Sequence, residues 1–230
     1  LGVDFEKIEN ARLLSPREYT FNEKLGYISL NSALNTDEIL AVAYEYNYRG
    51  QTYQVGELSE SSGISAPATL MLKLIKSTNF TPNSYTWDLM MKNVYRIGGG
   101  DLNAEEFELD VFFEDPGKGF KRFLPQPANM ENIPLITIFN LDKLNRTGDP
   151  QPDGKFDFIP GITINPPLGI IMFPVLEPFG TTLKDSIAAY MGVDTPFVYQ
   201  QLYDSTIVRA REFPELNRYT LKGKAKTSTS

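Results

Sequence analysis

The acidic stretch NRTGDPQPDGKFD, residues 145–157, has the spacing of the oxygen ligands in a calcium-binding loop. Asp149, Asp153 and Asp157 fall at positions one, five and nine of such a loop, and the residue after Asp153 is the glycine that permits a sharp turn. Calcium takes about six to eight oxygen ligands, so these three carboxylates are the candidate metal ligands. Position twelve of the loop, normally glutamate, is Pro160. The alternative to a calcium site is a plain acidic turn before a strand.

The residue types that the chain lacks exclude most catalytic chemistry. It contains no histidine and no cysteine, which excludes Ser-His-Asp catalysis, histidine or thiolate metal ligands, cysteine nucleophiles and disulfides. A glycosidase with two carboxylates about 5 to 10 Å apart stays open, but no spacing singles out such a pair. We therefore predict that the chain is not an enzyme and needs no cofactor other than the calcium considered above.

The overall composition indicates a globular protein that does not bind nucleic acid. Hydrophobic residues make up 41% and charged residues 22% of the 230 residues, as in ordinary folded domains. The 22 basic and 29 acidic residues give a net charge of −7, which repels phosphate backbones. No apolar run approaches the roughly 20 residues of a membrane helix. No signal peptide is visible at the start of the sequence, so we expect a mature chain or an excised fragment.

A tyrosine-rich hairpin is expected within a β-meander that covers residues 17–58. Residues 39–48, ILAVAYEYNY, alternate with period two, and an Arg-Gly turn leads into QTYQVGEL as the partner strand. The tyrosines on one face form either a cross-strand ladder on a half-buried sheet or a binding platform. We favour the ladder, because aromatic residues are common in strands. The tyrosines on this face of the expected hairpin are Tyr44, Tyr46 and Tyr48.

Two stretches far apart in the chain share one pattern. Residues 20–30 read TFNEKLGYISL and residues 163–173 read TINPPLGIIMF, and each is expected to form a β-hairpin. A glycine in each would supply the turn, while a leucine and an isoleucine in each would anchor the hairpin. The repeat is explained either by duplication or by chance similarity of two hairpins. The equivalent pairs are Leu25/Leu168, Gly26/Gly169 and Ile28/Ile171.

The other expected elements are short. Further strands are predicted at 69–77, 106–114 and 135–145, and the end of the chain, YTLKGKAKTSTS, is predicted to be a strand or a frayed tail. A short helix is predicted at 87–94 with Thr86 as its cap. Two further helices are predicted, one at 183–191 that ends at Gly192, and one that starts at Pro196 with Thr195 as its cap. The glycine run at 98–100 is not followed by Gly-Lys-Ser/Thr, so a phosphate-binding loop is rejected.

These patterns predict a mainly β fold of hairpin-rich, sandwich-like sheets with two short helices near the C-terminal end. Three parts are expected: a β-meander with the tyrosine hairpin at 1–60, a mixed but mainly β region at 61–148, and a second β unit with short helices and a trailing strand at 149–230.

Four long segments of the chain carry a family resemblance. They are SPREYTFNEKLGYISLNSALNTDEILAVAYEYNYRGQTYQVGE, TWDLMMKNVY, DPQPDGKFDFIPGITINPPLGIIMFPVLEPFG and FPELNRYTLKGKAK. In these segments the chain resembles the SprA family, also called Sov, the giant outer-membrane translocon of the type IX secretion system, which is tied to gliding motility in some bacteria. The resemblance covers nearly the whole chain and implies a fragment of a much longer protein.

The resemblance implies a segment inserted in, or attached to, a very large β-barrel with a protein-conducting pore. It implies as partners the rest of the barrel, a PorV-type outer-membrane protein, a plug protein and secreted cargo proteins. It brings no catalytic residues with it. An extracellular location is favoured over a periplasmic one, because outer-membrane barrels keep their periplasmic turns short.

Two functions follow from different classes of protein. The first is a structural and conduit segment of a secretion translocon. The second is a stand-alone cell-surface module that binds carbohydrate or protein through the tyrosines and is stabilised by calcium. Flanking sequence would discriminate between them, since a stand-alone module should complete its last strand.

Overall fold

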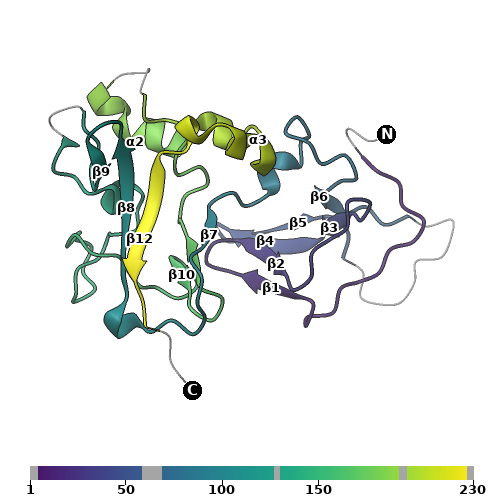
Figure 1. Ribbon diagram of the computed structural model, residues 1–230. Coiled ribbons are helices and arrows are strands. Elements are labelled where there is room, and N and C mark those ends of the chain that lie inside the picture. The colour runs from purple at the N-terminus through teal and green to yellow at the C-terminus, as the bar shows by residue number, and fades with distance from the viewer. Residues whose placement is uncertain (1–4, 59–68, 127–129, 192–195, 227–230) are drawn as a thin grey trace. The chain divides into compact units, whose positions relative to one another are not determined.

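The structure, a computed structural model, is mainly β with a few short helices, which confirms the predicted class (Figure 1). The chain divides into two compact units. Unit 1 comprises residues 1–20 and 28–90, and unit 2 comprises residues 21–27 and 91–230. The three parts predicted at 1–60, 61–148 and 149–230 stay a prediction. The residues described are 5–58, 69–126, 130–191 and 196–226.

Unit 1 contains two small antiparallel sheets. Strand β3 (Leu40–Val42) pairs with β6 (Lys73–Lys76), and β4 (Tyr44–Tyr48) pairs with β5 (Gln51–Val55). The single strand expected at 39–48 is therefore broken at Ala43, where the chain changes from one partner strand to another. A register shift between Leu40 and Ala41 marks the irregularity just before this change.

The helix expected at 87–94 is wrong. Only one 3-10 turn, η1 (Trp87–Leu89), forms there, and the Thr86 side chain makes no capping hydrogen bond. Trp87 is buried, and its ring lies against that of Phe80 with the ring centroids 5.3 Å apart. This packing, and not helical propensity, determines the conformation of the segment. The chain then enters strand β7 (Val94–Arg96) of unit 2.

Unit 2 is built around two three-stranded antiparallel sheets. In one, the central strand β8 (Glu108–Asp115) lies between β9 (Gly119–Lys121) and β12 (Tyr219–Lys224). In the other, β11 (Ile170–Met172) lies between β10 (Ile164–Asn165) and β7. The strands predicted at 106–114 and at the end of the chain are confirmed as β8 and β12.

The core of unit 2 is aromatic. Leu109, Val111 and Phe113 alternate inward along β8, as a half-buried strand requires. The ring of Phe139 meets those of Phe173 and Phe179 edge-on, at centroid distances of 5.7 and 5.1 Å. Such edge-to-face pairs contribute beyond the area that they bury, so this cluster holds the sheets together.

The strand predicted at 135–145 is wrong, because the chain forms a short helix, α1 (Leu135–Ile138), at that position. The buried residues Leu135, Ile136 and Phe139 have helical spacing. Asn140 then adopts a left-handed conformation (φ 59°) and ends the helix, with the Leu141 N–H donating to the carbonyl of Ile136 at 2.8 Å.

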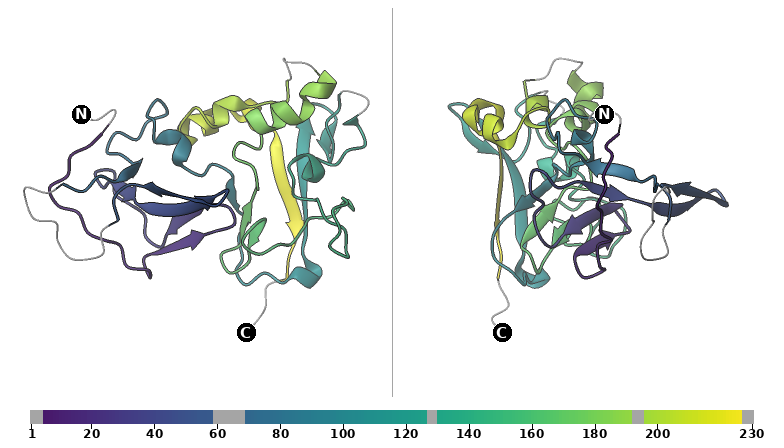
Figure 2. Two further views of the ribbon diagram at one scale, coloured as in Figure 1. Left: turned by 180° about the vertical axis from the view of Figure 1, so that it is seen from behind. Right: turned by 90° about the vertical axis from the view of Figure 1, so that its right-hand side faces the viewer.

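Near the C-terminal end, one of the two predicted helices is confirmed. Helix α2 (Thr181–Met191) lies at one end of β8 and β12 in all three views (Figures 1 and 2). The helix predicted to start at Pro196 is wrong, because a turn and the 3-10 turn η4 (Gln200–Leu202) follow there. Helix α3 (Ile207–Glu212) starts later, and its cap is Thr206. The predicted signals Gly192 and Thr195 lie outside the described residues.

In the part of the chain that the structure describes, no helix has the length and apolarity needed to cross a membrane.

Candidate functional site

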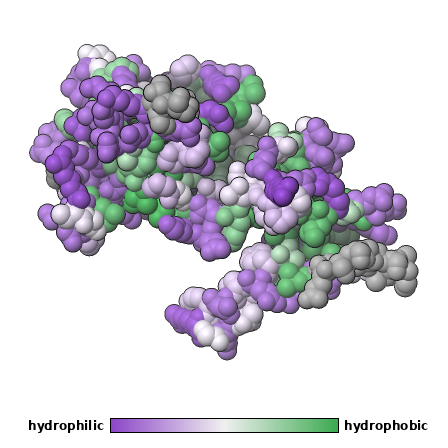
Figure 3. Space-filling view, turned by 90° about the horizontal axis from the view of Figure 1, so that it is seen from below, coloured by the Kyte–Doolittle hydropathy of each residue, from purple (hydrophilic) through white to green (hydrophobic). Residues whose placement is uncertain are grey.

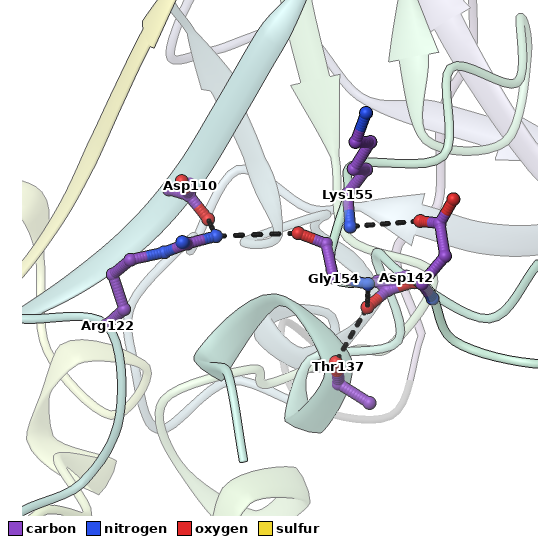
Figure 4. A network of polar contacts seen from close by, with 7 residues as sticks. Asp110, Arg122, Thr137, Asp142, Gly154 and Lys155 are labelled. Carbon is purple, nitrogen blue, oxygen red and sulfur yellow. Dashed lines mark hydrogen bonds and ion pairs between the residues drawn. The ribbon is translucent and has the colours of Figure 1, made fainter. Parts of the chain in front are cut away.

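The acidic stretch forms a loop of unit 2 that a buried carboxylate organises. Asp142 is fully buried at the start of the loop. Its Oδ1 accepts the N–H of Asp153 at 3.0 Å, and its Oδ2 accepts the N–H of Gly154 at 3.0 Å and the hydroxyl of Thr137 at 2.8 Å (Figure 4). Three donors therefore satisfy this carboxylate, which offsets the cost of burying it.

Asp157 holds the other end of the loop. Its Oδ2 accepts the backbone N–H groups of Lys143 and Leu144 at 2.6 and 3.1 Å. Its carbonyl oxygen accepts the hydroxyl of the buried Thr163, which in turn accepts the N–H of Ile159 at 3.0 Å. Asp157 thus holds the backbone at residues 143–144 and, through Thr163, the segment that leads into β10.

The remaining predicted ligands, Asp149 and Asp153, bind their own turns. Asp149 Oδ2 accepts the hydroxyl of Thr147 at 2.6 Å and the amide of Asn145 at 3.2 Å, and these hydrogen bonds lower the pKa of Asp149. Asp153 Oδ1 accepts the N–H of Lys155 at 3.1 Å. Each carboxylate therefore points to a different set of donors.

The structure does not gather these aspartates into a metal-binding group. All three lie within the described residues, where no cluster of three or more acidic, histidine or cysteine side chains could hold a metal ion. Calcium at Asp149, Asp153 and Asp157 stays a prediction from spacing. The spacing argument missed Asp142, although an acidic residue directly after a buried apolar run was a signal for it.

A neighbouring ion pair ties the loop to the sheet of β8. Arg122, the residue after β9, donates to Asp110 at 2.8 Å and lies 3.4 Å from the carbonyl oxygen of Gly154 (Figure 4). Both side chains are partly exposed, so solvent screens the attraction and the pair serves mainly to position the loop.

The tyrosine hairpin of unit 1 is a second candidate site. Arg49 and Gly50 adopt positive φ angles of 50° and 78°, as the expected tight turn requires. The rings of Tyr46 and Tyr53 stack across β4 and β5 at 5.2 Å, so the ladder is present. The prediction that this sheet is half-buried is wrong, because the tyrosines of the hairpin are between 39 and 54% exposed. These tyrosines are Tyr44, Tyr46, Tyr48 and Tyr53. No other described strand pairs with this two-stranded sheet, which extends away from the rest of unit 1 (Figure 2).

The two repeated segments both form hairpins, one from β1 (Tyr19–Asn22) and β2 (Tyr27–Leu30) and the other from β10 and β11. Gly26 and Gly169 turn the chain with φ angles of 66° and 59°. The two expected anchors of the second hairpin differ: Ile171 is fully buried, whereas Leu168 is 48% exposed, so the prediction for Leu168 is wrong. Leu168 directly precedes the turn glycine, and its side chain remains exposed to solvent.

The glycine run serves this second hairpin. The N–H of Ile97 donates to the carbonyl of Gly169 at 2.9 Å. A Cβ atom on Gly169 would lie 2.3 Å from the carbonyl oxygen of Gly99 and 2.6 Å from that of Gly98. The glycines therefore permit a close approach of two backbones, which accounts for the run without a phosphate.

The chain matches no protein-family model and no curated protein.

Proposed function

We propose that this chain is a non-catalytic segment of an outer-membrane protein translocon for type IX secretion, in the wall or vestibule of its pore. The observation that carries the proposal is the resemblance to the SprA family, which runs in long ordered strings over nearly the whole sequence. The segment would be inserted in, or attached to, a very large β-barrel at the extracellular face of the outer membrane.

The character of the surface supports passage of folded cargo. Large continuous apolar patches retain other proteins, and a conduit must avoid them. On the face drawn in Figure 3, hydrophobic residues lie interspersed among hydrophilic ones. The net charge of −7 also disfavours non-specific retention of acidic proteins.

The proposed partners are the rest of the barrel, a PorV-type outer-membrane protein, a plug protein and cargo in transit. The β4–β5 hairpin offers a surface for such contacts, because its aromatic face is exposed and both of its strand edges lack a further strand among the described elements. Aromatic side chains are enriched where proteins meet, and open strand edges can pair with another chain.

Cross-linking in cells tests this proposal. A photo-reactive amino acid replaces Tyr46 in the full-length translocon, and a cargo protein with a slowly exported fusion domain occupies the pore. We expect a cross-link to the cargo or to the PorV-type protein. The matched control places the same amino acid at Leu13, which is also exposed in unit 1 but lies outside the hairpin. Cross-links that are equally frequent at both positions would show that the hairpin has no special role.

A second candidate function is a cell-surface binding module, which the exposed tyrosine ladder favours. Stacked tyrosines on an open sheet can contact carbohydrate or protein surfaces through flat rings. Binding of the isolated chain to immobilised cell-surface material, lost in Tyr46→Ala, would favour this function over the conduit.

A further inference from the structure

Two peptide bonds of the chain join an aspartate to a proline, Asp115–Pro116 and Asp149–Pro150. Such a bond can be broken by its own side chain. The aspartate carboxylate reaches the carbonyl carbon of its own residue through a small ring, and carboxylates act as nucleophiles in this way in enzymes. The proline nitrogen carries no N–H and leaves as a secondary amine. The two bonds differ in their surroundings.

The carbonyl oxygen of Asp149 accepts two backbone N–H groups. The N–H of Gln151 donates to it at 2.7 Å, and the N–H of Asn145 donates to it at 3.0 Å. Both distances are those of the donors in an oxyanion hole. Donors at these distances polarise the carbonyl group and stabilise the negative charge that its oxygen acquires when a nucleophile adds to the carbon.

The carboxylate of Asp149 is held on the same turn. Its Oδ2 accepts the hydroxyl of Thr147 at 2.6 Å and the side-chain amide of Asn145 at 3.2 Å. Asn145 also fixes the backbone, because its Oδ1 accepts the N–H groups of Thr147 and Asp149 at 2.9 Å each. Asp149 and Pro150 are exposed, so water reaches the bond. The turn therefore presents a carboxylate, a polarised carbonyl and a proline leaving group together.

We propose that the chain cleaves itself between Asp149 and Pro150. The Oδ1 atom of Asp149 attacks the carbonyl carbon of the same residue, and a C–O bond forms while the C–N bond to Pro150 breaks. The electron pair of the broken bond stays on the proline nitrogen, which takes a proton from a hydronium ion. The products are a cyclic anhydride at Asp149 and a new amino terminus at Pro150. Water then opens the anhydride, which restores the side-chain carboxylate and frees the α-carboxylate, so the net reaction is hydrolysis of one peptide bond.

The other Asp-Pro bond is placed less favourably. Asp115 is the last residue of β8, and its side chain is only 13% exposed. The ammonium group of Lys118 lies 3.7 Å from Asp115 Oδ2. A neighbouring cation makes a carboxylate a weaker nucleophile, and burial limits the access of water. We therefore expect Asp115–Pro116 to persist under conditions that break Asp149–Pro150.

Cleavage should leave the two products associated. Strands β7 and β8 precede the cleaved bond, and they pair with β11 and β12, which follow it. The buried rings of Phe139 and Phe173 come from opposite sides of the bond and meet with their centroids 5.7 Å apart. Unit 2 should therefore keep its fold. The proposal does not depend on the conduit function, because each chain reacts once and the β4–β5 hairpin is not involved.

The test follows the purified 230-residue chain in a mildly acidic buffer in which circular dichroism shows it to be folded. A chelator is present, so that no metal ion occupies the carboxylate. Mass spectrometry after denaturation should show fragments 1–149 and 150–230, with Asp149–Pro150 broken at least about tenfold faster than Asp115–Pro116. Asp149→Asn should abolish this cleavage, and Pro150→Ala should slow it. Size-exclusion chromatography before denaturation should show the two fragments together.

Three results would overturn the proposal. The first is a chain that stays intact or is cut equally fast at both Asp-Pro bonds. The second is cleavage at Asp149–Pro150 that is as fast in urea as in the folded chain, since urea removes the two N–H donors from the carbonyl. The third is unchanged cleavage in Asp149→Asn. If that variant does not fold, Asp149→Glu takes its place, and an unchanged rate in this variant also counts against the proposal. Cross-linking to cargo from position 46 is unaffected by any of these results.

Discussion

The side-chain amide of Asn22 donates a hydrogen bond of 2.7 Å to the carbonyl oxygen of Gly161. This contact joins the tip of the first repeated hairpin to the segment that leads into the second. Nearby, the hydroxyl of Tyr27 lies 3.1 Å from the sulfur of Met172. Two segments of similar sequence, far apart in the chain, are therefore packed together within unit 2, where residues 21–27 belong.

Asn22→Asp isolates this contact. The aspartate keeps the Oδ1 acceptor for the N–H of Leu25, now at 3.0 Å, but loses the donor to Gly161 and places a carboxylate opposite a carbonyl oxygen. We expect urea unfolding to show a loss of about 1 to 3 kcal/mol, the cost of an unpaired group in a partly buried site. The control is Asn31→Asp, whose amide donates to the carbonyl of Arg17 at an exposed site and should cost less. Equal losses would mean that the Asn22 contact contributes no more than a surface hydrogen bond.

The two turn glycines should differ sharply in their tolerance of alanine. At Gly26 a Cβ meets nothing within 4 Å, so Gly26→Ala should cost only the left-handed conformation, about 1 to 2 kcal/mol. At Gly169 the Cβ would collide with the carbonyls of Gly98 and Gly99, which adds about 1 to 3 kcal/mol. Thermal unfolding of both variants measures the difference. A Gly169→Ala protein as stable as Gly26→Ala would contradict the close approach of the glycine run.

Ile171 and Leu168, the two residues expected to anchor the second hairpin, form another matched pair of substitution sites. Ile171→Asp places an unpaired charge in the core of unit 2 and should cost about 3 to 5 kcal/mol, enough to unfold a marginally stable domain. Leu168→Asp changes an exposed side chain and should stay within about 0.5 kcal/mol of the parent. Circular dichroism melts of the two variants give the comparison, and a Leu168→Asp protein that fails to fold would show that Leu168 is an anchor after all.

The calcium prediction is tested by chelation. If Asp149, Asp153 and Asp157 bind calcium, the ion stabilises the folded state by mass action, and a chelator should lower the melting temperature. Asp153→Ala should abolish this difference. The matched control is Asp185→Ala, since Asp185 is an exposed aspartate on α2, outside the loop. Identical melting curves with and without chelator would contradict the calcium prediction. The hydrogen bonds of Asp142 and Asp157 would then account for the loop without a metal ion.

Local signals in the sequence predicted the hairpins well. Period-two alternation with Arg49-Gly50 placed β4 and β5, and the repeated glycines Gly26 and Gly169 placed two turns. These features depend on residues close together in the chain, where backbone preferences decide the outcome.

The errors arose where tertiary packing decides. The run at 135–145 was taken for a strand, because a short apolar run does not distinguish a strand from a buried helix. Leu168 and Ile171 are equally apolar, and only the pairing of β11 with β7 shows which of them is buried. The buried Asp142 was missed because its donors, at Thr137, Asp153 and Gly154, come together only in the folded loop.

The measurement that tests the central claim most directly is export from cells whose translocon lacks this segment. We predict that deletion of the 230 residues from the full-length protein blocks secretion of type IX cargo, while Sec-dependent export continues and the barrel still assembles in the outer membrane. Ile171→Asp in the full-length protein should reduce cargo export, and Leu168→Asp should not. Normal cargo export from an assembled barrel without this segment would contradict the conduit role and favour the binding module.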